Sequence, residues 1–123
     1  MKKLLTFIIA FAIVACNKEG CVSPLLPEIE QQCDTAPHAA YSRLLEIDSE
    51  RELPNEASKA KYALLLTKSA DKAYIRHTSD STIKRALTYY ESNGSTAELA
   101  EAQYYMGSVY RDMYDAPKAV IWY

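Results

Sequence analysis

The pattern of the C-terminal stretch, from Thr96 to Tyr123, limits the fold of this chain more than any other feature. From about Thr96 to Met113, apolar residues recur at i, i+3, i+4, i+7 and i+8, which predicts a helix with one apolar face: Ala102, Tyr105, Met106, Val109 and Tyr110. A second helix should follow, because Asp115 is suited to cap it and Pro117 fits its first turn. Gly107 in mid-helix costs about 1 kcal/mol relative to Ala. We therefore expect a close helix contact there, with Ala119 opposite.

This segment, Ala100–Tyr123, resembles one tetratricopeptide repeat (TPR). Four residues carry the resemblance as a repeat signature: Gly107, Tyr110, Asp115 and Ala119. The segment departs from the repeat pattern at three positions, where Trp, Leu and Gly are usual: Gln103, Met106 and Tyr114. The alternative is any helical hairpin with a small-residue contact. TPR units have a period of about 34 residues. Two residue pairs are separated by nearly this period, Ala86 from Ala119 and Tyr90 from Tyr123, so the pattern extends upstream of the segment.

The rest of the chain predicts further helices. The first should begin near Pro37 and end near Glu52, and the second should cover Glu56 to about Lys72. A third should follow a cap at Ser79 or Asp80 and stop at Asn93-Gly94, with the glycine in the left-handed conformation. Ser95 and Glu98 then form a capping box for the next helix.

These elements predict an all-α chain of about five helices. The TPR resemblance implies that its helical hairpins form a short α-solenoid over residues 35–123, with about two and a half repeats and the last one incomplete. Residues 1–15 and 16–34 are expected to lie outside this domain, as an N-terminal signal and a linker. Within the linker, Glu28–Cys33 is expected to form a short helix or the remnant of one.

The N-terminal signal has a positive start, Lys2-Lys3, and an apolar stretch from Leu4 to Val14. This stretch is shorter than the roughly 20 residues that a spanning helix needs. Ile13-Val14-Ala15-Cys16 resembles the lipobox of bacterial lipoproteins. The resemblance implies cleavage before Cys16 and acyl chains on its thiol and new amino end, which anchor the protein in a membrane. The alternative is a plain secretory signal in which Cys16 is incidental.

The implied location is the bacterial cell envelope. The outer membrane is favoured over the inner membrane, because Asn17 is not the usual inner-membrane retention residue of lipoproteins. An exported chain meets an oxidising compartment, so Cys21 and Cys33 could form a disulfide worth about 2–4 kcal/mol. The alternative is two unpaired thiols.

The sequence predicts no enzyme. It has no Gly-rich phosphate loop and no histidine beside a convincing Ser or Cys nucleophile motif. The cysteines and histidines lack the paired spacing of a zinc site, so we expect neither a metal nor a cofactor beyond the covalent lipid on Cys16. The net charge of −2 gives no electrostatic footprint for nucleic-acid binding.

The predicted function is that of a membrane-anchored scaffold for a protein or peptide partner. The TPR resemblance implies a groove along the first helices of the repeats, with these candidate contacts: Tyr62, Gln103, Tyr104, Ser108 and Arg111. Alternatively, Tyr62 and Tyr104 simply cover neighbouring helices. The apolar end Val120–Tyr123 is expected to dock on a partner or to mediate self-association.

The overall arrangement, including the stretch YALLLTKSADKAYI, is similar to TPR lipoproteins common in Bacteroidota. Members of that group are usually longer. Two other functions therefore remain open. The chain could be a truncated remnant of a TPR sensor or regulator with no independent activity, or an accessory lipoprotein of a nutrient-uptake system.

Overall fold

The computed structural model describes residues 22–123, and the regular structure in this range is entirely helical. The helices are α2 (Leu26–Thr35), α3 (Pro37–Leu45), α4 (Ser49–Glu52), α5 (Glu56–Lys72), α6 (Ser81–Asn93), α7 (Thr96–Asp112) and α8 (Ala116–Trp122). The all-α prediction is confirmed for these residues. The predicted signal (1–15), Cys16 and Cys21 lie outside the described residues. Across 22–123, every helix is too short or too polar to span a membrane.

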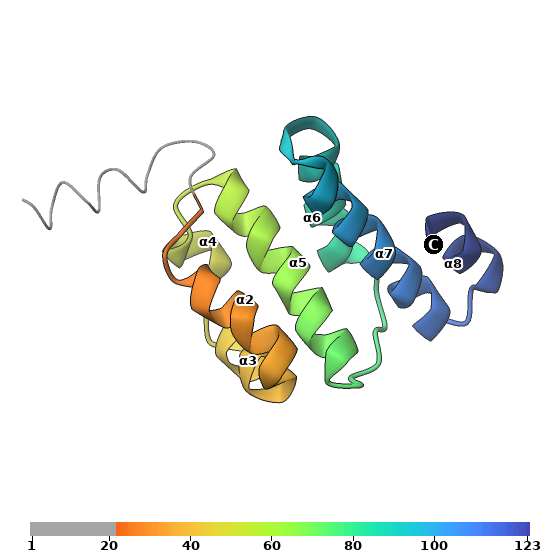
Figure 1. Ribbon diagram of the computed structural model, residues 1–123, viewed down its shortest axis with the longest axis horizontal. Coiled ribbons are helices and arrows are strands. Elements are labelled where there is room, and N and C mark those ends of the chain that lie inside the picture. Colours follow the sequence, from red (N-terminus) through yellow and green to blue (C-terminus); the bar gives the residue numbers. More distant parts are fainter. Residues whose placement is uncertain (1–21) are drawn as a thin grey trace, which may run out of the picture.

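The longer helices of residues 22–123 pack as three consecutive pairs, α2/α3, α5/α6 and α7/α8. Helix α5 packs against both helices of the first pair, and α7 packs against both helices of the second. Within the described range, α2 and α3 do not pack against α6, α7 or α8. Figure 1 shows α5 between the α2/α3 pair and the α6/α7 layer, with α8 at the far end. Each pair therefore contacts only its neighbours in the sequence.

Helix α5 separates two apolar clusters. Leu65 on α5 joins the cluster of the first pair, with Leu26, Ile29, Cys33, Ala40 and Leu44. Leu64, the next residue, joins the larger cluster between α5, α6 and α7, with Ala60, Ala63, Ile83, Ala86, Leu87, Tyr90, Ala102, Tyr105, Met106 and Val109. Burying a leucine or isoleucine contributes about 1.5–3 kcal/mol, so both faces of α5 stabilise the fold.

The N-terminal half of the domain differs from the sequence prediction. Part of the predicted 16–34 linker forms α2, whose Leu26 and Ile29 are buried against α3 and α5. The single helix expected from Pro37 to Glu52 is divided into α3 and α4. The division occurs because the Asp48 carboxylate accepts hydrogen bonds from the backbone N–H groups of Glu50 and Arg51, which starts a new helix.

The ends of the later helices agree with the predicted positions. The Ser95 hydroxyl accepts from the backbone N–H of Glu98 and begins α7, which is one half of the predicted capping box. The Glu98 carboxylate accepts from the Ser95 hydroxyl. Helix α6 ends at Asn93, but the predicted left-handed glycine is wrong, because Gly94 is extended with φ −90°. A Cβ on Gly94 would lie 2.5 Å from Cδ1 of Tyr90. The close approach of Tyr90, and not a left-handed backbone conformation, therefore explains why glycine occupies position 94.

Candidate functional site

Helices α5 and α7 are structural counterparts in successive pairs. Both have 17 residues, and both begin at a side-chain cap, Asn55 for α5 and Ser95 for α7. Both end in the same turn, in which a tyrosine with φ 59° follows the C-cap residue. Helices α6 and α8 correspond when Ala86 is matched with Ala119, since both alanines are buried. This correspondence allows the two helix pairs to be compared position by position.

The comparison shows that one face of the α7/α8 pair is uncovered. Leu64, Leu87 and Tyr90 of the α5/α6 pair belong to the cluster that α7 completes, and they are 0%, 4% and 3% exposed. Their counterparts Tyr104, Val120 and Tyr123 are 50%, 74% and 59% exposed. We call these three residues the α7–α8 face. Within residues 22–123, the position equivalent to that of α7 on the preceding pair is open.

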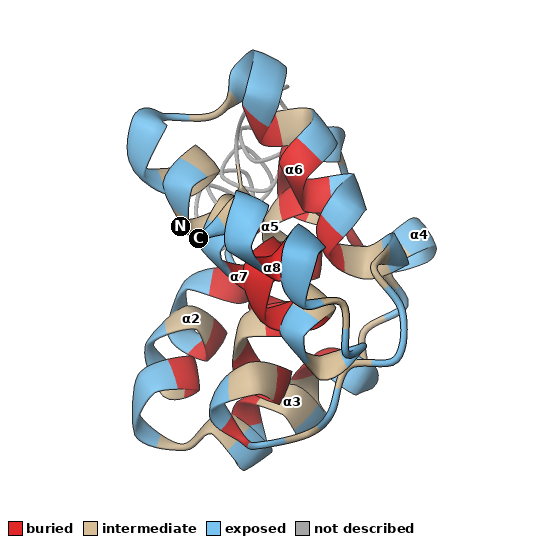
Figure 2. Ribbon diagram, turned by 90° about the vertical axis from the view of Figure 1, so that its right-hand side faces the viewer, coloured by how far each residue is buried: buried red, intermediate tan, exposed pale blue. Residues whose placement is uncertain are grey.

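Figure 2 views this end of the molecule, with the exposed side of α8 toward the viewer. Helix α8 packs against α7 alone among the described helices. Ile121 is also 77% exposed beside Val120, which widens the apolar surface. Exposed apolar patches that are rimmed by polar residues commonly mark protein interfaces.

The four repeat-signature residues join α7 to its neighbours. The nearest atoms to a Cβ built on Gly107 belong to the ring of Tyr123, at 2.9 Å, and not to the expected Ala119. The Tyr110 hydroxyl donates to Asp80 Oδ2 over 2.8 Å, and this hydrogen bond raises the pKa of Tyr110. Asp115 caps α8 by accepting from the Lys118 N–H, and Ala119 is buried.

Ion pairs link the first helices of the three pairs. Lys61 of α5 pairs with Glu30 of α2. The Lys68 ammonium lies 2.9 Å from Glu101 Oε1 on α7 and 3.8 Å from Asp34 Oδ1 on α2. Its side chain is only 13% exposed, so this pair is better shielded from solvent than a typical surface ion pair.

A polar cluster lies where α5 and α7 end. Asp71 is in the last turn of α5, His77 is in the loop before α6, and Asp112 is the last residue of α7. His77 Nε2 lies 3.5 Å from Asp71 Oδ1 and 3.9 Å from Asp112 Oδ2, and the His77 backbone N–H donates to Asp112 Oδ2 over 3.0 Å. Arg111 donates to Oδ1 of both aspartates, over 2.9 Å and 3.0 Å.

The His77 side chain is only 9% exposed, and its Nε2 has no hydrogen-bond partner among the described residues. The pKa of Asp71 is lowered, first by the neighbouring His77 ring; burial opposes this effect, and Arg111 adds to it. Two carboxylates and one guanidinium therefore surround an imidazole nitrogen that is poorly satisfied. Sequence reasoning missed this cluster, because no local motif connects its members.

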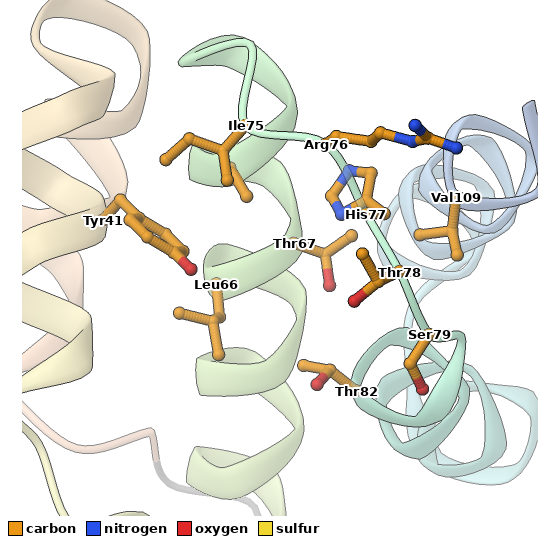
Figure 3. A pocket seen from close by; sticks show the side chains of 11 residues that line it. Tyr41, Leu66, Thr67, Ile75, Arg76, His77, Thr78, Ser79, Thr82 and Val109 are labelled. Carbon is orange, nitrogen blue, oxygen red and sulfur yellow. The ribbon is translucent and has the colours of Figure 1, made fainter. Parts of the chain in front are cut away.

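A small cavity of about 180 Å³ lies beside the cluster. Figure 3 shows His77 and Arg76 of the loop on one side of it and Tyr41 of α3 on the other. The lining combines hydroxyl groups and apolar side chains with one arginine and one histidine: Tyr41, Leu66, Thr67, Ala70, Ile75, Arg76, His77, Thr78, Ser79, Thr82 and Val109. The cavity volume suits water or a very small solute, and it is below the range of typical small-molecule sites.

The structure does not place the five groove candidates on one surface. Tyr62 contacts the first pair, and its hydroxyl donates to the carbonyl of Leu44 over 3.0 Å. Ser108 is fully buried and accepts a hydrogen bond from Tyr123, whose ring also contacts Tyr104. Arg111 belongs to the polar cluster, and Gln103 is half-buried. Only Tyr104 of this set contributes to the α7–α8 face.

Cys33, one member of the predicted disulfide, is fully buried and is unpaired within residues 22–123. Its Sγ lies 4.0 Å from the carbonyl oxygen of Leu65. Burial raises the pKa of this thiol to about 11. Because Cys21 is outside the described residues, the disulfide stays a prediction.

No family model matches this chain, and no curated protein or solved structure shows significant similarity to it.

Proposed function

We propose that this protein is a non-enzymatic, membrane-anchored scaffold of TPR-like helical hairpins, and that its α7–α8 face binds an amphipathic helix of a partner protein. The observation that carries the proposal is the contrast between Leu87, which α7 covers, and Val120, its exposed counterpart on α8. The neighbour-only packing of the helix pairs supports a solenoid-like arrangement. In such a stack, each pair offers its outer face to one further helix.

The chemistry of the partner follows from what α7 presents to the α5/α6 pair. Helix α7 contributes Ala102, Tyr105, Met106 and Val109, which recur at i, i+3, i+4 and i+7. A partner helix should carry small and large apolar residues at this spacing, so that it packs closely against Tyr104, Val120 and Tyr123. Binding of an apolar helix face to a hydrophobic surface is a recurrent recognition mode.

The membrane anchor rests on the sequence around Cys16, which lies outside the described residues. It is tested by the intact mass of the native protein, extracted with detergent from the membrane fraction of its source cells. Lipoprotein processing predicts a mass equal to residues 16–123 plus acyl chains. An unmodified mass would contradict the anchor, and a much heavier species would show that this sequence is part of a longer protein.

The binding face is tested by photo-crosslinking in the same cells. A photoreactive phenylalanine analogue replaces Val120 in one variant and Thr88 in a control. Thr88 is exposed on α6 at the position matched to Ile121, and it lies outside the α7–α8 face. We expect position 120 to crosslink to the apolar side of one helix in a single partner, and position 88 to give little of that product.

Equal crosslinking from both positions, or none above background, would contradict the proposed face. A crosslink between two copies of this chain would replace the partner by self-association through the same surface. A crosslink to residues encoded after Tyr123 would show that the face is covered within a longer chain.

A further inference from the structure

We propose that Asp71, His77 and Asp112 bind a divalent first-row transition metal ion, for which zinc is the best match. This inference is independent of the proposed partner-binding face. One ligand atom from each of the three residues can be chosen so that all lie within 4.8 Å of one another. The three residues come from α5, the following loop and α7, so that one ion would join all three segments.

The first argument is the state of the His77 ring. Its side chain is more than nine-tenths buried, and Nε2 faces two carboxylates without a hydrogen-bond partner in the part of the chain that the structure describes. A buried polar atom without a partner is unfavourable, because it has lost its hydrogen bonds to water. An ion coordinated by Nε2 would remove this cost and would also bind the two carboxylates that face the nitrogen.

The second argument is distance. Zinc binds imidazole nitrogen and carboxylate oxygen at about 2.0–2.2 Å in tetrahedral sites, which places neighbouring ligand atoms about 3.3–3.6 Å apart. The distance from Nε2 to Asp71 Oδ1 is 3.5 Å, and that to Asp112 Oδ2 is 3.9 Å. The first distance is already suitable, and the second needs a movement of roughly 0.3–0.6 Å to reach this range. The two carboxylate oxygens lie within 4.8 Å of each other and would have to approach by up to roughly 1.5 Å. Three protein ligands leave a fourth position for water.

The third argument concerns charge and ligand type. Two carboxylates face Nε2 and attract a cation, but the guanidinium groups of Arg111 and Arg76 lie beside them and offset their charge. A nitrogen ligand suits zinc or cobalt better than calcium or magnesium, which prefer oxygen ligands. Arg111 occupies Oδ1 of both aspartates, but each carboxylate has further lone pairs. Because the guanidinium competes for these carboxylates, we expect a moderate affinity.

The surroundings would also orient the ligands. The backbone N–H of His77 donates to Asp112 Oδ2, and Arg76 donates to the Asp112 carbonyl oxygen over 3.1 Å. Such outer contacts commonly hold metal ligands in position. Asp71 and Asp112 are 14% and 17% exposed, so an ion can reach the site from solvent.

The test is a titration of the full-length chain in detergent micelles with Zn²⁺, and in parallel with Co²⁺. We expect saturable binding of one ion that raises the melting temperature. The Co²⁺ absorption spectrum should show nitrogen and oxygen ligands without thiolate charge transfer. H77Q should weaken binding at least tenfold, whereas H38Q, which changes an exposed histidine, should leave it unchanged. Circular dichroism verifies that both variants fold.

A second measurement needs no variant and therefore does not depend on how H77Q folds. In the wild-type protein with ¹⁵N-labelled histidines, Zn²⁺ should shift the ring nitrogens of His77 and leave those of His38 in place. The proposal is overturned if Zn²⁺ and Co²⁺ do not saturate a site, if binding is the same in H77Q, or if the Co²⁺ spectrum shows only thiolate ligands.

Discussion

Tyr74 and Tyr114 occupy the same position in two copies of one turn. Each has φ 59°, and they are the non-glycine residues with positive φ among those that the structure describes. In both turns, the residue after the tyrosine donates its N–H to a carbonyl five positions back, Ile75 to Ala70 over 2.8 Å and Asp115 to Tyr110 over 2.9 Å. This is the hydrogen-bond pattern of the Schellman motif, in which glycine is usual at the left-handed position.

The two tyrosines should respond differently to replacement by glycine. Tyr74 is 96% exposed, so Y74G should stabilise the protein by about 0.5–1 kcal/mol because it removes the left-handed cost of a side chain. Y114G should change stability by less. Here the loss of the contact between the Arg76 guanidinium and the Tyr114 ring, at 4.4 Å, offsets the gain. Urea denaturation measures both variants.

The control is R76A in each background. R76A should increase the gain from Y114G, because the cation–π contact is already absent, and should leave the effect of Y74G unchanged. Equal effects of Y74G and Y114G in the wild-type background would contradict an energetic role for the Arg76 contact.

These turns show how far the sequence predicts the fold. Helices α5, α7 and α8 begin at the side-chain caps expected from the sequence, because capping depends on a few neighbouring residues. Helix α6 begins after Asp80 as expected, but the Asp80 carboxylate accepts from Tyr110 and does not cap the helix. Helix α2 is harder to predict, since its stability comes from burial of Leu26 and Ile29 against helices that follow it in the chain. The break at Asp48 escapes prediction because Ser49–Glu52 are all polar, so that no change in apolar spacing marks the start of a new helix.

At Gly107, we expect replacement by alanine to affect stability in the opposite direction from the usual one. In a helix interior, glycine to alanine normally stabilises by about 1 kcal/mol. In this protein the new Cβ would lie 2.9 Å from Cδ1 and Cε1 of the Tyr123 ring, so G107A must displace that ring and break its hydrogen bond to Ser108. We expect G107A to be neutral or destabilising in the wild-type protein.

The same substitution in a Y123A background should stabilise by about 1 kcal/mol, because the obstructing ring is absent. Thermal or urea denaturation of the four proteins in this double-mutant cycle measures the coupling. A stabilising effect of equal size in both backgrounds would show that Tyr123 does not pack on Gly107.

Tyr62 allows the structural role to be separated from a binding role. Its hydroxyl donates to the Leu44 carbonyl near the end of α3, and its ring packs against the first apolar cluster. Y62F should therefore cost about 0.5–1.5 kcal/mol in stability. It should leave crosslinking from position 120 unchanged. Y74F, which alters an exposed side chain, is the matched control and should have no effect on stability. Loss of crosslinking in a folded Y62F protein would favour the groove predicted from the sequence.

The polar cluster could not be predicted from the sequence, whereas Val120 and Tyr123 of the α7–α8 face belong to the apolar end that the sequence predicts to dock on a partner or on a second copy. Asp71, His77 and Asp112 meet only because the ends of α5 and α7 lie side by side, and no local motif connects them. The α7–α8 face has an obvious apolar sequence, but apolar residues at helical spacing predict burial equally well. The contrast between exposed Val120 and buried Leu87 separates these two outcomes, and the structure adds Tyr104 to the uncovered face.

Cys33 should make stability depend on alkaline pH. Its pKa is raised from 9.0 to about 11 by burial, so the folded state favours the neutral thiol. The stability that comes from keeping this thiol protonated is fully present below pH 9 and is lost as the pH rises through 11. The total loss is up to about 2–3 kcal/mol. At pH 7, C33A should be less stable than the wild type by about 1 kcal/mol, because it leaves a small gap beside Leu65. The difference should shrink as the pH rises above 9 and should reverse before pH 11, because the stability that the wild type loses exceeds the initial difference of about 1 kcal/mol.

Urea midpoints of the wild type and C33A, measured across this pH range, test the role of Cys33. The comparison isolates the thiol, because the other alkaline titrations are common to the two proteins. A difference that is independent of pH would show that Cys33 does not titrate as a buried thiol, as expected if it forms a disulfide with Cys21. Addition of a reductant would then restore the pH dependence, because only the reduced sulfur can carry a proton.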